Sequence, residues 1–596
     1  MRFSSPRYTL SLAVAAALLA PDGRTQTATP AAANQEATTL DAVIVSGTAR
    51  FKGLAKRDAS FSITTASPEQ IQQAVPQSTA DLLKIVPGVW AEPSGGGTGA
   101  NIFVRGMPSE GDAPFVTMQL DGSPLFPPPT LSFLENSTLF RVDDTVERME
   151  VLRGGSSPIF SNGQPGLTVN FIQKKGQDEP EGSVRLTGGN NALRRIDVFN
   201  SGPMGNGWYY SVGGFFRETD GVRDPQFSAD KGGQFSATLS KRWDSGELSF
   251  YARRIDVTLD DGRQATRQGF TSTAFLNLRA KYDGENIAAF VADEWELSER
   301  LRLDLGARYE RQSVTGDVHD TTTVDLDGNP ATLYDNATSL ALATTRRIDQ
   351  DDEAFSWTAG LNFTLDQNNS LFARVNSGVK FPGFDNLRDG QNRVQDVDQY
   401  ELGLKSGTSV YDLYLTAFYN TFKNSPFQAF LANGENFTAV GDSRARGLEV
   451  EGAIRPFGGF ELAGTGVWLD AKYRNYREFT GNRVMRQPKR QFRITPSYYW
   501  MLPFGDLKVF ATYSYIGERF ADLANSQRLP AYDMLDIGAH LHVGEHWEVT
   551  ASGSNFTDTL GLTEGNVRVP GAATGGVFMG RPIAGRQYQL SVAYRW

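Results

Sequence analysis

The 596-residue sequence contains no cysteine and only four histidines. A disulfide framework is therefore excluded, and so is any cysteine-ligated metal or cluster site. Positive charge is also scarce, because 58 Lys and Arg face 68 Asp and Glu, which gives a net charge of -10. This balance disfavours a nucleic-acid-binding protein, since such proteins rely on a basic face.

Long apolar runs are almost absent. The longest lies within residues 9–20, and no later stretch approaches the roughly 18 apolar residues that a transmembrane helix needs. If the protein is in a membrane, it must be a β-barrel, because only helices and closed barrels satisfy their backbone hydrogen bonds in lipid.

The N-terminus has the pattern of a secretory signal peptide. Arg2 and Arg7 precede the apolar run Leu10–Ala20, which is too short to act as a membrane anchor. We assign residues 1–28 to the signal peptide, with cleavage anywhere between 20 and 33. An exported chain without cysteine fits a bacterial envelope better than a eukaryotic secreted scaffold.

Residues 29–50 have linker composition with one short β-branched run inside, Leu40–Gly47 (LDAVIVSG). Such a run can add a strand to the edge of a partner's sheet, or it can be the first edge strand of this chain. The spacing does not decide between the two.

Residues 51–178 are expected to form a small mixed α/β domain. Ser67 followed by Pro68 predicts the start of a helix, and Ser78 with Asp81 predicts the start of a second one. Short strands are predicted at 101–105, 116–120 and 148–152, separated by Gly, Pro and Asp clusters.

From residue 179 to 596 the sequence predicts a transmembrane antiparallel β-barrel. In the last strand the large apolar residues share one face, and polar or small residues occupy the other. The apolar residues are Tyr588, Leu590, Val592, Tyr594 and Trp596. Short turns alternate with long connections, which we place at 218–231, 314–352, 381–397, 423–443, 519–530 and 558–585.

An N-terminal domain followed by such a barrel resembles the TonB-dependent outer-membrane receptors, in which the first domain plugs the barrel lumen. The motifs that carry the resemblance keep their order along nearly the whole mature chain. They are DLLKIVPGV (81–89), VRG (104–106), VERMEVLRG (146–154), QYELGLK (399–405), RGLEVEG (446–452) and NFTD (555–558).

The resemblance implies an active importer that is not an enzyme and carries no cofactor. Its implied partners are TonB with the inner-membrane energy complex, a small ligand, outer-membrane lipid and lipopolysaccharide, and the barrel assembly machinery. The implied TonB box is Leu40, Asp41, Ala42, Val43, Ile44 and Val45. The implied plug–barrel charge cluster is Arg105 and Arg153 on the plug, facing Glu401 and Glu449 on the barrel.

Two regions are candidates for ligand contact. Plug loops at 93–100 and 123–130 contain Gly95, Gly97, Leu125 and Phe126. A basic cluster stands against the acidic chain at Lys472, Arg474, Arg477, Arg483, Arg486, Lys489 and Arg490. This cluster could attract an anionic ligand such as a ferric chelate, or it could contact lipopolysaccharide phosphates.

Two other patterns are weaker than they look. Ser94–Gly99 resembles a phosphate-binding loop, but it precedes a strand and offers no helix N-terminus. His540, His542 and His546 have a spacing that could bind a metal, yet no further ligand is close in the sequence. We interpret the histidines as polar strand residues and expect no metal site.

The resemblance implies a ferric siderophore as the default cargo, with an aromatic or plant compound, a carbohydrate or cobalamin as alternatives. A different class remains open, a passive porin-like or adhesin barrel whose plug is never energised.

The strand count is expected to depart from the family. Counting strands from both ends gives about 18, whereas the resemblance implies 22. Only about 30 residues separate the strand near 247–257 from the strand near 287–296, and each strand needs about 9–11 residues. One additional strand at 271–282 would make the number of strands odd, whereas bacterial barrels of this kind have an even number. We therefore expect the missing strands to fall between Val257 and Asn286, leaving a narrower barrel or a seam.

Overall fold

The computed structural model describes residues 42–50, 53–92, 100–109, 113–125, 137, 140–161, 164–221, 228–259, 279–325, 337–430, 436–565 and 580–596. The predicted signal peptide lies outside this range, as do Leu40 and Asp41. So do most of the two candidate plug loops, including Gly95, Gly97 and Phe126.

The N-terminal domain is a small α/β unit built on a five-stranded sheet in the order β3-β8-β9-β6-β7. These strands are β3 (Ile63–Ala66), β6 (Val116–Leu120), β7 (Ser123–Pro124), β8 (Val146–Arg153) and β9 (Leu167–Gln173). Two further pairs are β1 (Val43–Ile44) with β2 (Leu54–Ala55) and β4 (Val89–Glu92) with β5 (Asn101–Val104). The helices are α2 (Pro68–Gln73), α3 (Thr79–Leu82) and α4 (Ser157–Phe160), with single turns at Lys56–Asp58 and Leu83–Ile85.

Both predicted helix starts are present. Ser67 forms a full capping box with Gln70, and Pro68 occupies the first helical position, where its missing N–H costs nothing. Ser78 accepts a hydrogen bond from the Asp81 backbone N–H and begins α3. Between the helices Val75 has a φ of +47°, so the chain turns sharply after α2.

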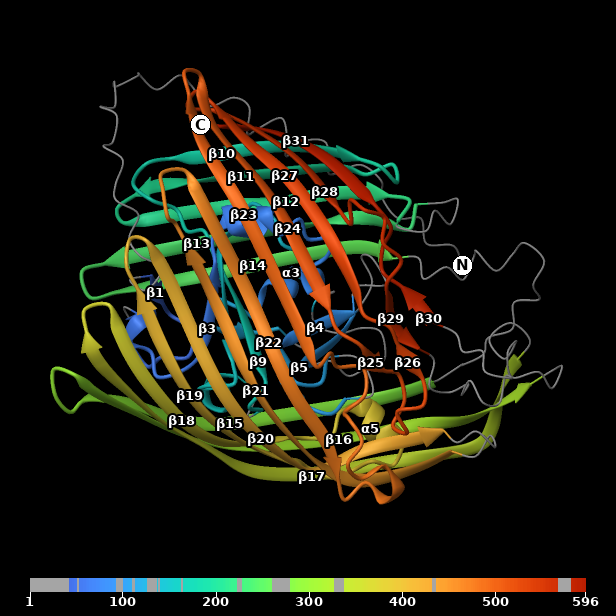
Figure 1. Ribbon diagram of the computed structural model, residues 1–596. Coiled ribbons are helices and arrows are strands. Elements are labelled where there is room, and N and C mark those ends of the chain that lie inside the picture. The colour runs from blue at the N-terminus through green and yellow to red at the C-terminus, as the bar shows by residue number, and fades with distance from the viewer. Residues whose placement is uncertain are drawn as a thin grey trace. The chain divides into compact units, whose positions relative to one another are not determined.

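The rest of the chain closes into an antiparallel barrel of eighteen strands, which confirms the predicted count (Figure 1). The strands of the first half are β10 (Glu181–Gly189), β11 (Arg194–Gly205), β12 (Trp208–Thr219), β13 (Asp230–Trp243), β14 (Gly246–Leu259), β15 (Arg279–Glu296), β16 (Leu301–Asp325), β17 (Ala337–Asp366) and β18 (Asn369–Lys380). Those of the second half are β19 (Gln395–Gly407), β20 (Tyr411–Phe430), β21 (Asn436–Ile454), β22 (Phe460–Arg474), β23 (Arg490–Leu502), β24 (Gly505–Ile516), β27 (Tyr532–Val543), β28 (Trp547–Ser554) and β31 (Gln587–Arg595). Within the described part of the chain, the helices are all too short or too polar to cross a bilayer.

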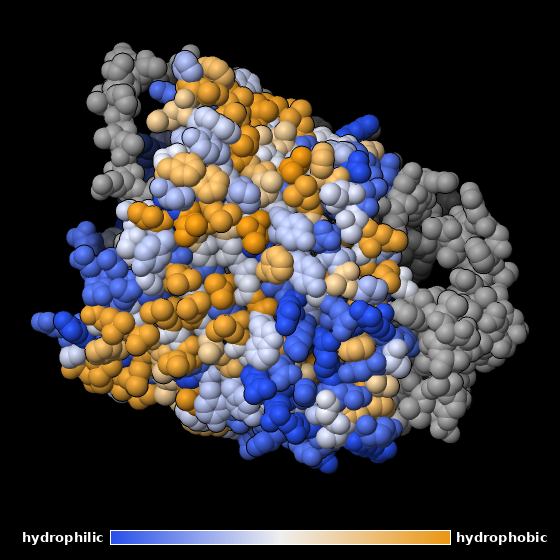
Figure 2. All heavy atoms as spheres, viewed as in Figure 1, coloured by the Kyte–Doolittle hydropathy of each residue, from blue (hydrophilic) through white to orange (hydrophobic). Residues whose placement is uncertain are grey.

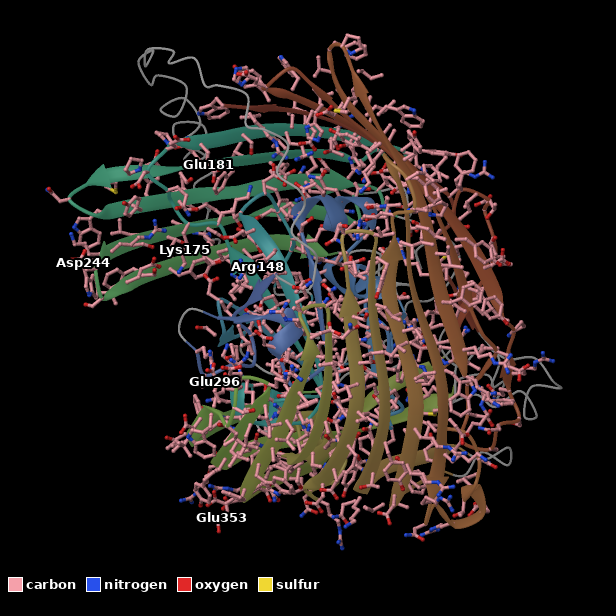
Figure 3. The ribbon with its side chains drawn as sticks, turned by 60° about the vertical axis from the view of Figure 1, so that its left-hand side comes forward. Arg148, Lys175, Glu181, Asp244, Glu296 and Glu353 are labelled. Carbon is pink, nitrogen blue, oxygen red and sulfur yellow. The ribbon has the colours of Figure 1, made fainter. Side chains whose placement is uncertain are left out.

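The junction between β14 and β15 differs from the others. The described residues define a paired register at every other junction of the ring but give none here. Phe290 of β15 stays 56% exposed although its ring lies 6.0 Å from Phe160 of the plug. Asp244 and Glu296, which mark the short-turn ends of the two strands, stand apart in Figure 3. The junction is where the sequence predicts a seam.

The expected loops at 314–352 and 423–443 are wrong as single loops. β16 and β17 remain paired as far as Asp325 and Ala337, and β20 and β21 as far as Phe430 and Asn436. The first stretch is rich in the β-branched residues Thr and Val, which favour strands, and contains one concentrated turn signal at Asp327–Pro330. Other connections carry short elements, namely α5 (Phe384–Arg388), a turn at Arg477–Phe479, β25 (Arg519–Phe520) with β26 (Arg528–Leu529), and β29 (Leu562–Gly565) with β30 (Gly580–Pro582).

The N-terminal domain fills the barrel lumen, and one core joins the two. Buried residues from the domain, including Phe115 and Phe171, belong to the same cluster as Phe418 and Leu469 of the barrel wall. Outside, hydrophobic side chains gather over the strands in view in Figure 2. We use the name plug for the N-terminal domain, and we call the two rims of the barrel the short-turn end and the long-loop end.

The last strand allows a test of the outward face. Leu590, which is 53% exposed, pairs with Ala551 at the centre of β28, whereas Tyr594 pairs with Trp547 beside a short turn. With lipid outside the barrel, Leu590→Arg should cost about 2–4 kcal/mol of folding free energy, and Tyr594→Arg about 0–1 kcal/mol. The folded fraction on a heat-modifiability gel reports both. Equal losses for the two variants would contradict this depth assignment.

Candidate functional site

The plug meets the wall through a buried set of charges, and the structure brings the four predicted residues together. Arg105 donates from Nε and Nη2 to both oxygens of Glu449 at 2.8 Å, and from Nη1 to Glu401 at 2.9 Å. Arg153 donates from Nη1 to Glu449 at 2.9 Å. Among the described contacts, Glu401 pairs with Arg105 and not with Arg153.

Two glycines of the sequence motifs explain how the plug backbone approaches these carboxylates. Gly88 and Gly154 have φ values of +78° and +76°, which side chains rarely tolerate. A Cβ at Gly88 would collide with Glu449, and one at Gly154 would press on Glu401. The motifs therefore preserve space at the ion pairs.

Burial makes this cluster energetically important. The side chains of Arg105, Arg153, Glu401 and Glu449 are at most 2% exposed. Burial disfavours the charge on Arg105, but Glu449 and then Glu401 outweigh it and raise the pKa of Arg105 above its usual value. Removing one member of such a buried set leaves its partner's charge uncompensated.

Sequence reasoning missed the third carboxylate, Glu451. It accepts hydrogen bonds from Arg153 at 3.2 Å and from Thr64 at 2.7 Å, and it lies 3.4 Å from Lys56. The signal was present in the RGLEVEG motif, because residues two apart on a strand share one face. Glu449 and Glu451 therefore both point into the lumen.

A second group of contacts fastens plug residues 56–60 to the wall. Lys405 of β19 donates to the carbonyls of Lys56 and Ala59 at 2.7 and 2.6 Å. Arg374 of β18 donates to the Ser60 carbonyl at 3.1 Å and pairs with Asp304 of β16. Lys405 ends the QYELGLK motif, but the motif does not indicate which plug residues it meets, since many strand charges face a barrel lumen.

The described part of the 40–47 segment is an edge strand of this chain. β1 pairs with β2, Ile44 is fully buried, and Val43 and Val45 are 53% and 39% exposed. The backbone N–H groups of Val45 and Ser46 donate to Glu150 at 3.0 and 2.8 Å.

The residues that follow this strand are held at the short-turn end of β15. The Thr48 hydroxyl and the Ala49 N–H donate to Glu294 at 2.5 and 3.0 Å. Arg50 pairs with Glu294 at 2.9 Å and with Glu296 at 2.8 Å. These contacts are few and partly solvent-exposed, unlike those of the buried cluster.

At the long-loop end an aromatic cluster covers the plug. Phe427 and Tyr476 stack at 4.1 Å, Tyr473 packs on Tyr476 at 4.3 Å, and Phe115 of the plug meets Phe422 at 6.1 Å. Leu125, the described residue of its candidate loop set, is half-buried against this cluster.

The basic cluster at 472–490 does not act as one surface. Arg477 is exposed and Arg474 is half-buried, so both remain candidates for ligand contact. Arg486, however, is buried and pairs with Glu92 of the plug and with Glu564. Burial raises the pKa of Glu92, and Arg486 offsets only part of this effect. Arg486 therefore lies apart from the exposed part of the basic cluster, because it already pairs with a buried plug carboxylate.

The histidine pattern is resolved into separate environments. His540 faces the lumen, with Nδ1 3.0 Å from the Thr550 hydroxyl and its ring stacked on Phe510 at 5.4 Å. His546 lies with Nδ1 2.8 Å from the Arg595 carbonyl. Among the described residues, His, Asp and Glu side chains form no group suited to a metal ion.

One buried carboxylate of the plug, that of Asp143, has a raised pKa. Asp143 accepts hydrogen bonds from the Thr145 N–H at 3.0 Å and hydroxyl at 2.5 Å, and from Gln234 of β13 at 2.9 Å. Burial nevertheless raises its pKa to about 6. The folded state therefore binds the Asp143 proton more tightly than the unfolded chain does.

The buried cluster predicts a large effect for Glu449→Gln. The change leaves Arg105 and Arg153 short of negative charge, so the free energy that holds the plug should fall by about 3–5 kcal/mol. Urea-dependent protease cleavage of the plug measures this loss. The control is Asp351→Asn, which breaks an exposed 2.5 Å pair with Arg311 and should leave the cleavage of the plug close to the wild-type profile. Equal effects would show that the buried cluster does not hold the plug.

The pKa of Asp143 predicts a pH dependence. Because it rises from about 3.9 in the unfolded chain to about 6 in the fold, stability from this group is complete at low pH. It is lost as pH rises through about 6. Asp143→Asn should remove the part of the fall in melting temperature that Asp143 causes as the pH rises through about 6. An unchanged pH profile in the variant would contradict the assignment.

Comparison with known proteins accounts for this arrangement. The protein-family model described as "TonB dependent receptor-like, beta-barrel" matches residues 147–556 of this chain. The family model described as "TonB-dependent Receptor Plug Domain" matches residues 55–168. The vitamin B12 transporter BtuB of Vibrio vulnificus (strain CMCP6) is 22% identical, over 88% of this chain and 92% of its own length.

Solved structures show the same fold at low sequence identity. The ferric yersiniabactin uptake receptor FyuA from Yersinia pestis is 16% identical, with a TM-score of 0.67 over 90% of this chain and 98% of its own. BauA, the ferric preacinetobactin receptor from Acinetobacter baumannii, is also 16% identical, with a TM-score of 0.64 over 91% and 98%. From these matches and the plug held in its barrel, the chain belongs to the TonB-dependent receptor family.

Proposed function

We propose that this protein is an active importer in the outer membrane of a Gram-negative bacterium. Ligand binds at the long-loop end, and TonB pulls on residues 40–47 at the short-turn end, which faces the periplasm. The observation that carries the proposal is the contrast in how the plug is held. Thr48, Ala49 and Arg50 rely on partly exposed contacts with β15, whereas Arg105 and Arg153 are deeply buried.

That contrast suits a pulled segment. Val43 and Val45 are exposed on an edge strand, so a partner strand can add there by main-chain hydrogen bonds. The pair between Arg50 and Glu296 is solvent-exposed, so water can replace it at little cost, and the pair with Glu294 is exposed on the side of Arg50. A force on this segment would therefore break the exposed contacts first, before the ion pairs of the buried cluster separate.

A ferric siderophore is the proposed cargo. The exposed Arg477 at the long-loop end would attract an anionic ferric chelate. The alternatives are an aromatic compound, a carbohydrate or cobalamin, and the similarity to a vitamin B12 transporter keeps cobalamin among them. Arg477 and the neighbouring Arg474 could instead contact lipopolysaccharide phosphates.

The last strand, with its outward aromatic residues, is the proposed contact for the barrel assembly machinery.

A passive porin-like or adhesin barrel is the rival function. A porin needs an open aqueous lumen, but here the plug and the wall share a continuous buried core. This packing favours a transporter whose lumen must be opened over a porin that conducts solutes continuously.

Deletion of residues 40–47 tests energised import. Cells that carry the deletion should bind radiolabelled ferric chelates at wild-type levels but lose uptake, because the pulling segment is gone. Deletion of residues 34–39, which lie in the same linker but beyond the expected cleavage positions, should leave uptake intact. Persistent uptake without residues 40–47 would favour the passive barrel, and a panel of ferric chelates and cobalamin in the same assay identifies the cargo.

A further inference from the structure

Two cavities lie along the same flank of the plug, away from the buried charge cluster. The larger has a volume of about 440 Å³ and lies between the plug and the wall made by β10, β11, β12, β28 and β31. It reaches the short-turn end, where Glu181 and Trp596 line it. The smaller, about 80 Å³, lies between the plug and β22, β23, β24, β27 and β28, nearer the long-loop end.

Gln77 lines both cavities and stands between them. Its side-chain Nε2 donates to the Ser554 hydroxyl of β28 at 3.1 Å, which connects the plug to the wall. Its backbone N–H donates to Asp81 at 2.9 Å, and its carbonyl accepts from Arg217 of β12 at 3.5 Å. At this point the two cavities are therefore separated by the side chain and the backbone of Gln77.

The backbone around Gln77 is rigid, so the side chain is the part that can yield. Pro76 fixes its own φ, and the left-handed Val75 ends α2. Ser78 caps α3, and the Thr79 hydroxyl donates to the Phe140 carbonyl at 2.6 Å inside the plug. The Gln77–Ser554 hydrogen bond is therefore the side-chain contact by which this partition is held to the wall.

The lining of the larger cavity suits hydrated polar solutes. Asp144 of the plug, Arg185 of β10 and Arg595 of β31 line it. The two arginines are joined behind the lining by Glu548 of β28, and the ion pairs of this series have distances from 2.5 to 3.4 Å. Both signs of charge occur, so neither anions nor cations are excluded.

The smaller cavity presents two buried donors. Among the described residues, the Nε1 atom of Trp90 and the Nη1 atom of Arg493 have no hydrogen-bond partner. Both residues line this cavity, and such donors call for water or another acceptor.

We propose that the two cavities are the halves of one passage for ions and small hydrated polar solutes, and that Gln77 closes it. The passage runs along the wall formed by β27, β28, β31 and β10. It lies apart from the ion pairs on β19 and β21 that fasten the plug. As the exit route of the importer, the passage rests on the proposed function, but its closure by Gln77 can be measured without any cargo.

Ion flux through the purified protein in proteoliposomes, with potassium chloride as the probe, tests the closure. Gln77→Ala should raise the flux several-fold over wild type, because it joins the two cavities. Gln491→Ala is the matched control. It removes another plug–wall hydrogen bond, 2.8 Å to the Val89 carbonyl, but lines the smaller cavity alone, so its flux should stay at the wild-type level. Equal flux in both variants would overturn the proposal.

A thiol version separates closure from misfolding. Because the chain has no cysteine, Gln77→Cys introduces a single reactive site. Its raised flux should fall on modification with a methanethiosulfonate reagent that restores side-chain bulk, and should return when a reductant removes it. Gln491→Cys, modified in the same way, should show no change. A leak that persists after complete modification of Gln77→Cys would place the opening elsewhere and overturn the proposal.

Discussion

The need to satisfy every backbone hydrogen bond around a closed ring sets the conditions for the rest of this protein. Strands in lipid have no water to replace a missing partner, so the barrel must close and turn its apolar face outward. The inward face is then polar by alternation. A domain that fills such a lumen must match polar and charged side chains, and Glu401, Glu449 and Glu451 meet Arg105, Arg153 and Lys56 for this reason.

A polar interface can be strong on one side of a domain and weak on another. Opposite β19 and β21 the carboxylates are buried, and Glu449 is shared between two arginines, so breaking any pair leaves a charge uncompensated. Beside β10 and β31, paired charges instead line a cavity of about 440 Å³. At the short-turn end, Arg50 and Glu296 are exposed to solvent. The plug is thus held unevenly around its circumference.

Closure is also where this barrel departs from the 22 strands that the family resemblance implies. Eighteen strands complete the ring, and the described residues define a register at every junction except β14–β15. The neighbouring β15 also holds the segment that follows β1, through Glu294. The unusual junction and the contacts of residues 48–50 therefore share one strand.

The sequence by itself determined the elements with short-range signals. Period-two alternation marked the strands, Ser67 and Ser78 marked the helix starts, and the count between Val257 and Asn286 limited the ring to eighteen strands. Tertiary structure decided which charges meet. Local patterns cannot show that Arg486 neutralises Glu92, that Lys405 supports the backbone near Ala59, or that Gln77 separates two cavities, because each partner lies hundreds of residues away. The tall hairpin of β16 and β17 likewise needed pairing across the strands, since polar alternation alone does not distinguish an extended strand from a loop.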